Sequence, residues 1–172
     1  MITIISGTAR PNSNTRKVAN AYAKLLTNLG HANQVLCLQQ TSMLQRDEQF
    51  VATEKTHLAD VQKIIIVMPE YNGTFPGILK LMIDNTNVSK VWPQKKILLT
   101  GVSTGRAGNI RGMEHLTGSL MHMQSVVHPN RLPISGVQNL LNANGELDNE
   151  AMLAVMPPPN AAASSPASST SR

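Results

Sequence analysis

The stretch KIIIVMPEYNGTFPG, residues 63–77, contains a strand, a loop and the start of a helix in immediate succession. Apolar residues fill every position from 64 to 68. A strand that is apolar at every position is buried on both faces, as in a parallel sheet that helices cover on each side. Pro69 and the Asn72-Gly73 pair then predict a turn, and Pro76 suits the first turn of a helix. The stretch therefore predicts a central strand of a parallel α/β sheet.

The N-terminus repeats this arrangement. Residues 2–5 (ITII) form a short apolar strand, and the polar loop 7–15 (GTARPNSNT) follows it directly. From residue 14 to 29 the apolar positions fall three or four apart, which is the helical period, and Gly30 ends the helix. Both polar loops thus follow a buried strand and precede a helix.

The remaining chain continues the alternation. Residues 39–53 are expected to form a loop, and Leu58 and Val61 to lie in a short helix. The other predicted elements are strands at 34–38, 96–102 and 124–128 and helices at 76–87 and 109–123, the last with Ile110, Met113, Leu116 and Leu120 facing inward. Alternating strands and helices predict an α/β fold with a doubly wound five-stranded parallel sheet in the order 2-1-3-4-5. In that order the ligand crevice lies between strands 1 and 3, where both polar loops emerge.

The 172 residues suit one domain, residues 1–156, followed by a Pro/Ala/Ser-rich disordered tail, residues 157–172. Residues 148–156 are expected to begin a last helix that the prolines at 157–159 cut short. The net charge of +5 is scattered along the chain without a long basic run, which argues against nucleic acid as a partner.

The cysteine and histidine content excludes two further classes. The single cysteine, Cys37, rules out a disulfide framework and is expected to be a buried thiol in its strand. The five histidines show no metal-binding spacing, so no metal is expected. With neither a signal peptide nor an apolar run of about 20 residues, the chain is expected to be cytoplasmic and without a membrane partner.

Loop 7–15 collects groups that bind anions. It carries the hydroxyls of Thr8, Ser13 and Thr15, the amide of Asn14 and the guanidinium of Arg10. A helix N-terminus adds unpaired N–H groups and partial positive charge. Neither an ATP-type P-loop nor a dinucleotide glycine fingerprint is present, so the phosphate of a mononucleotide is expected. Helix capping explains Ser13 or Asn14 equally well, but capping does not need Arg10.

Loop 69–77 suits a flat heterocycle, because a rigid turn there would present polar backbone groups. An ordinary Asn-Gly turn with Tyr71 at the rim explains the same residues. Taken with loop 7–15, it indicates a phosphorylated cofactor.

In these two loops the chain resembles the NAD(P)H-dependent FMN reductases, a flavodoxin-like family that includes quinone, azo-dye and chromate reductases. GTAR at 7–10 with Ser13-Asn14-Thr15 is similar to the family's FMN phosphate loop. PEYNGTFPG at 69–77, with Leu79-Lys80 and Ile83-Asp84, is similar to its most specific signature. The resemblance covers about residues 1–150 and implies a flavodoxin-like fold, although the family's full C-terminal helix is replaced here by Pro/Ala/Ser sequence.

The resemblance also implies which residues bind FMN. The phosphate would be held by the loop of Thr8, chiefly by Arg10, Ser13, Asn14 and Thr15, and the isoalloxazine would be lined by Pro69, Glu70, Tyr71, Asn72 and Gly73. Ser103, Thr104 and Gly105 resemble the third loop, which closes on the other side of the ring. A flexible strand–helix connection is the alternative for residues 103–108.

The activity implied is that of an oxidoreductase. NADPH or NADH would pass a hydride to bound FMN, and a quinone, a flavin or a similar small acceptor would then take the electrons. The cofactor carries this chemistry, so no side chain is expected to be catalytic. The family's homodimers or homotetramers are expected as well. The alternatives are a flavodoxin-like electron carrier and a non-enzymatic FMN-binding protein.

Overall fold

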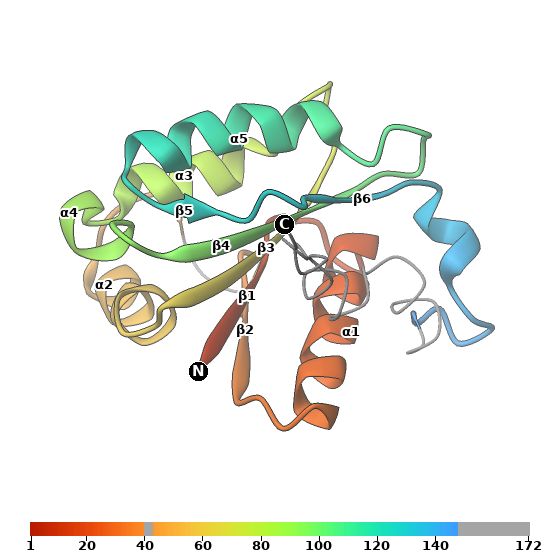
Figure 1. The fold of residues 1–172 in the computed structure, drawn as a ribbon, viewed down its shortest axis with the longest axis horizontal. Helices are drawn as coiled ribbons and strands as arrows, with labels where there is room; N and C mark the ends of the chain where they lie inside the picture. The colour runs from red at the N-terminus through yellow and green to blue at the C-terminus, as the bar shows by residue number, and fades with distance from the viewer. Residues whose placement is uncertain (40–42, 148–172) are drawn as a thin grey trace, which may run out of the picture.

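A single parallel sheet forms the centre of the computed structural model, which describes residues 1–39 and 43–147. Its strands are β1 (Ile2–Ser6), β2 (Asn33–Cys37), β3 (Lys63–Pro69), β4 (Lys96–Val102), β5 (Val126–Val127) and β6 (Leu132–Ile134). They follow the order β2-β1-β3-β4-β5, and β6 also pairs with β4 (Figure 1). The predicted fold class and strand order are confirmed. The predicted last helix at 148–156 and the tail at 157–172 lie outside the described residues.

Strand β3 occupies the middle of the sheet, as its sequence predicts. It pairs in parallel with β1 on one side and with β4 on the other. Ile64, Ile66 and Met68 enter one hydrophobic cluster, and Ile65 and Val67 enter a second one on the opposite face. Because successive side chains of a strand point to opposite faces, an unbroken apolar run buries both faces.

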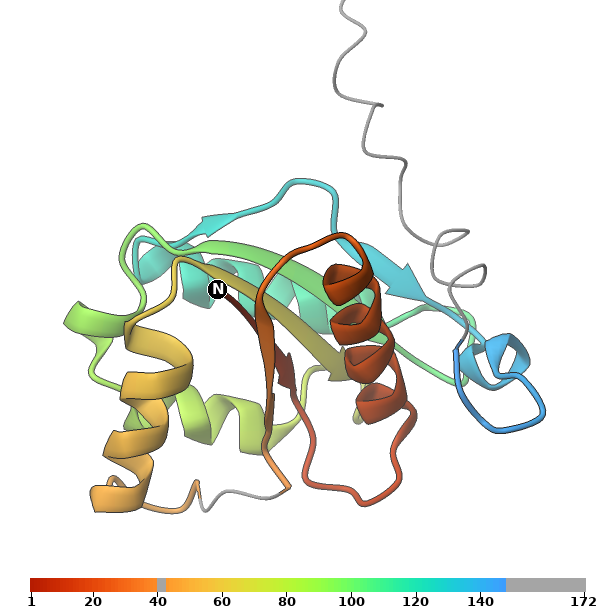
Figure 2. The same ribbon diagram turned by 90° about the horizontal axis from the view of Figure 1, so that it is seen from below.

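Helices cover the two faces unequally. Helix α1 (Asn14–Asn28) packs on one face, with Val18 and Tyr22 fully buried, and α3 (Gly77–Asn85) and α5 (Ile110–His122) lie on the other (Figures 1 and 2). That second face is covered by α2 (Glu48–Glu54), the π-helix η1 (Lys55–Ala59), α3 (Gly77–Asn85), α4 (Val88–Val91) and α5 (Ile110–His122), whose buried residues share one cluster. The arrangement leaves the carboxyl edge of the strands open to the loops that follow them.

Three predictions about helices are wrong in part. Val61, expected to lie in a short helix with Leu58, comes after the end of η1 at Ala59. Helix α2 starts at Glu48, inside the predicted loop, because the Asp47 carboxylate accepts a hydrogen bond of 2.8 Å from the Phe50 N–H and caps it. Its buried positions are Phe50 and Glu54, and because one of the two is charged, the apolar pattern of this helix is weak. Ile110, expected to face inward, is 49% exposed at the start of α5.

The fifth position of the sheet is divided between two short strands. The predicted strand at 124–128 is reduced to β5, and β6, which also pairs with β4, was not predicted. Pro133 lies inside β6, where a missing N–H is tolerated because, among the described residues, β6 pairs with β4 alone and so forms an edge. After β6 the 3₁₀ helix η2 (Val137–Leu140) returns the chain to the carboxyl edge.

Two further sequence expectations concern single features. Cys37 is buried at the end of β2, as predicted. Within residues 1–39 and 43–147, no helix has the length and apolar character needed to cross a bilayer.

Candidate functional site

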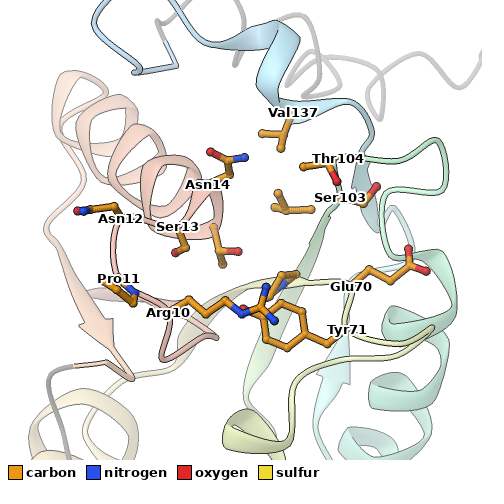
Figure 3. Close-up of a pocket in the computed structure, with 13 residues that line it drawn as sticks. Arg10, Pro11, Asn12, Ser13, Asn14, Glu70, Tyr71, Ser103, Thr104 and Val137 are labelled. Atoms are coloured by element: carbon orange, nitrogen blue, oxygen red, sulfur yellow. The ribbon is translucent and has the colours of Figure 1, made fainter.

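A crevice with a volume of about 310 Å³ opens at the carboxyl ends of β1, β3 and β4. This is the predicted position between strands 1 and 3. The crevice is lined by Arg10, Pro11, Asn12, Ser13, Asn14, Thr15, Pro69, Glu70, Tyr71, Val102, Ser103, Thr104 and Val137 (Figure 3). The structure therefore brings together residues from all three loops that the sequence singles out.

The N-terminus of α1 forms one wall. Ser13 caps the helix, and its hydroxyl oxygen accepts a hydrogen bond of 3.1 Å from the Arg16 N–H. The backbone N–H groups of residues 12–15 meet no acceptor within the described part of the chain. Capping thus accounts for Ser13, while free donors and the positive end of the helix remain available to an anion.

Thr8 and Arg10, from the loop after β1, both contact Tyr71 from the loop after β3. The Thr8 hydroxyl lies 2.6 Å from the Tyr71 phenol oxygen, and Thr8 itself is only 1% exposed. The Arg10 guanidinium lies over the Tyr71 ring, 4.1 Å from its centre (Figure 3). Thr8 consequently lies behind the crevice wall and holds Tyr71, whereas Arg10 lines the crevice itself.

Residues 71–74 form a tight hairpin. The Tyr71 N–H donates to the Thr74 carbonyl at 2.9 Å, and the Thr74 N–H donates back at 3.2 Å. Asn72 and Gly73 have φ of 53° and 81°, the left-handed conformation that a type I′ turn requires at both central positions. Asn72 and Gly73 shape the turn without lining the crevice, and the Thr74 hydroxyl lies 2.8 Å from His115 Nδ1 of α5.

The loop after β4 closes the opposite side of the crevice. The Ser103 hydroxyl donates to the Gly105 carbonyl at 2.8 Å and accepts from the Gly108 N–H at 2.9 Å. The Val137 N–H donates to the Ser103 carbonyl at 3.1 Å. These bonds favour a structured wall over a flexible connection. Ser103 and Thr104 line the crevice, whereas Gly105 does not.

Sequence reasoning missed some of the lining residues. Pro11 and Asn12 lie in the loop that it singled out, and Val102 ends a predicted strand, so position along the chain could have found them. Val137 has no such local signal, because it reaches the crevice only through β6 and η2. Among residues 1–39 and 43–147, no group of three or more His, Cys, Asp or Glu side chains is placed to hold a metal ion.

The sequence matches the family model described as NADPH-dependent FMN reductase over residues 1–138. The chain belongs to this family. A 2-hydroxy-1,4-benzoquinone reductase from Burkholderia sp is 30% identical over 100 residues, which are 56% of this chain and 55% of that protein. An NADPH azoreductase from Bacillus sp. (strain OY1-2) is 26% identical over 152 residues, covering 87% of this chain and 83% of the relative.

Solved structures share the fold that this family member adopts. The flavoenzyme NAD(P)H:(acceptor) oxidoreductase FerB from Paracoccus denitrificans superposes with a TM-score of 0.72 at 20% identity, covering 88% of this chain and 87% of that one. The chain spans about half the length of the first two curated relatives, 55% of one and 51% of the other.

Proposed function

We propose that this chain is an NAD(P)H-dependent oxidoreductase that holds FMN in the crevice and reduces a quinone, a flavin or a similar small acceptor. The observation that carries the proposal is that the N-terminus of α1 and the loop that leads into a hydrogen-bonded hairpin line one crevice. Membership of the FMN reductase family supports the same assignment.

The residues at the N-terminus of α1 fit a phosphate. The N–H groups of residues 12–15, which meet no acceptor among residues 1–39 and 43–147, lie at or just before the positive end of α1, and the side chains of Ser13, Asn14 and Thr15 add neutral donors. No acidic side chain lies among the lining residues from 10 to 15. A dianionic phosphate is therefore favoured there by both hydrogen bonding and charge.

The other end of the crevice fits a planar ring. Pro69, Glu70 and Tyr71 form one side, and Ser103 and Thr104 form the other. Internal hydrogen bonds hold both walls, so a ring could bind between them at a small ordering cost. We infer that Thr8 and Gly105 support the walls and that Asn72 and Gly73 set the hairpin's shape.

When bound, FMN would supply the redox chemistry that couples hydride donation by NADPH or NADH to reduction of the acceptor. The protein's task is to orient the ring, to anchor the phosphate and to leave one ring face open to the co-substrate. None of these tasks needs a side chain to move a proton, so the proposal names no catalytic residue. Arg10 lines the crevice, and its positive charge favours the approach of a phosphate-bearing nicotinamide nucleotide.

Steady-state oxidation of NADPH and NADH by FMN-loaded protein, with a benzoquinone as acceptor, tests the proposal. Turnover that depends on protein, FMN and quinone together is the expected result. FMN binding without turnover would indicate a flavodoxin-like carrier or a non-enzymatic FMN-binding protein instead. Sedimentation velocity on the same sample tests the homodimer or homotetramer that we infer from the family resemblance.

A further inference from the structure

Asn109 occupies a helix-capping position but does not cap the helix. It precedes α5, and its side chain makes no capping hydrogen bond. Instead its Nδ2 donates to the carbonyls of Met68 and Pro69, at 3.3 and 2.8 Å, where β3 ends. Pro69 lines the crevice and leads into the hairpin. The amide therefore ties the start of α5 to the last residues of β3.

The surrounding glycines are packed around this side chain. A Cβ on Gly101 would overlap the Gly108 carbonyl and lie 3.0 Å from the Asn109 Cβ, and a Cβ on Gly112 would overlap the Asn109 amide. Asn109 is completely buried. Small residues on two sides thus leave a space that fits the Asn109 side chain and little else.

Asn109 brings two local costs. Its φ of 60° is left-handed, a conformation in which glycine is less strained than asparagine. Its Oδ1 is buried and meets no partner within the described part of the chain. Glycine would avoid both costs, and capping does not explain asparagine. Such costs concentrate at functional sites, where another requirement keeps the residue in place.

We propose that Asn109 is a positioning residue. It fixes the separation between the hairpin loop 69–74 and the loop 103–108, and it thereby determines how tightly the crevice binds a flavin ring. The Asn109 side chain joins the two walls of the crevice, because Asn109 directly follows loop 103–108 and its amide donates a hydrogen bond to Pro69, the first residue of loop 69–74. This role rests on the proposed function. The Glu70 N–H to Val102 carbonyl bond, 3.0 Å, is the neighbouring tie between the same walls.

The test uses Asn109→Gly, which keeps the left-handed backbone and removes the amide. The matched control is Gln124→Gly, at an exposed residue with φ of 63° at the far end of α5. Gly112→Ala is a second variant, because its methyl group displaces the Asn109 side chain without removing it. Three quantities are measured: amide hydrogen exchange of residues 70–74 in FMN-free protein, the dissociation constants of FMN and riboflavin, and the reduction potential of bound FMN.

Asn109→Gly and Gly112→Ala are expected to speed exchange in residues 70–74 and to shift the flavin potential. Both variants should weaken the binding of FMN and of riboflavin by a similar factor, about tenfold. The lost hydrogen bonds support the walls beside the flavin ring and not the phosphate end of the crevice. Gln124→Gly should match the wild type in all three measurements. If Asn109→Gly had the same exchange rates, flavin affinities and reduction potential as the wild type, the positioning role alone would be overturned. If the wild-type protein bound no FMN, the proposed function would be overturned.

Discussion

Replacing Arg10 with alanine tests the phosphate end of the crevice. A charge-assisted hydrogen bond to a phosphate contributes about 1.5–3 kcal/mol. In the structure Arg10 lies over the half-buried Tyr71 ring, and giving up a cation–π contact of this kind costs about 0.5–1 kcal/mol. The difference is about 0.5–2.5 kcal/mol, so Arg10→Ala should weaken FMN binding roughly 2- to 70-fold.

Quenching of flavin fluorescence on titration with protein measures this effect. Riboflavin lacks the phosphate, so its affinity should change by less than about twofold, and the FMN effect should shrink at high salt because charges are screened. Arg16→Ala is the matched control: it removes the same charge from a side chain that bonds Asn20 on α1 at 3.2 Å, outside the crevice. Equal losses for FMN and riboflavin would refute the reasoning, since they would show that Arg10 acts through Tyr71.

Three further predictions concern the elements that support the crevice. Gly73→Ala forces alanine to a φ of 81° and should lower the free energy of unfolding by about 1 kcal/mol in urea titrations. The control Gly77→Ala, at the start of α3 with open space around it, should not lower this free energy. Equal effects of the two substitutions would contradict the turn assignment. Thr8→Val removes the hydroxyl that bonds Tyr71 and should cost about 1 kcal/mol in the same assay; unchanged stability would show that the bond contributes nothing. The Arg46 guanidinium, hydrogen-bonded to Glu54 at 2.7 and 2.9 Å, holds the pKa of that carboxyl below its ordinary value. Because the folded state lowers this pKa, the ion pair stabilises the protein above pH about 4.3, and that stabilisation is lost as pH falls through the folded-state pKa. The difference in melting temperature between wild type and Glu54→Gln should therefore narrow from pH 7 to pH 3, and a constant difference would exclude the ion pair as its cause.

The centre of the fold could be predicted from the sequence because the order of apolar and polar residues there indicates directly which positions are buried. The apolar run 64–68 implies two covered faces, and the two polar loops after β1 and β3 mark the ligand edge. Helix α2 escaped prediction because one of its buried positions is Glu54, whose charge is compensated by Arg46 only in the folded chain. Residue patterns do not contain such partners.

The same reason limits the prediction of the site. The sequence names Thr8, Arg10 and Tyr71 as candidates, but their contacts join residues about sixty positions apart and depend on the register of β1 against β3. In the sequence Asn109 is only the first residue of a predicted helix, and its left-handed conformation and its bonds to β3 are visible only in the structure. The position of Val137 at the crevice depends on β6, and the proline inside β6 hides its strand character in the sequence.

A crystal structure of the protein grown with saturating FMN tests the central claim most directly. The account predicts the phosphate at the N-terminus of α1, within hydrogen-bond distance of the backbone N–H groups of residues 12–15. It predicts the ring between Tyr71 and the wall formed by Ser103 and Thr104. FMN bound elsewhere, or a crevice without flavin density at saturating FMN, would contradict it.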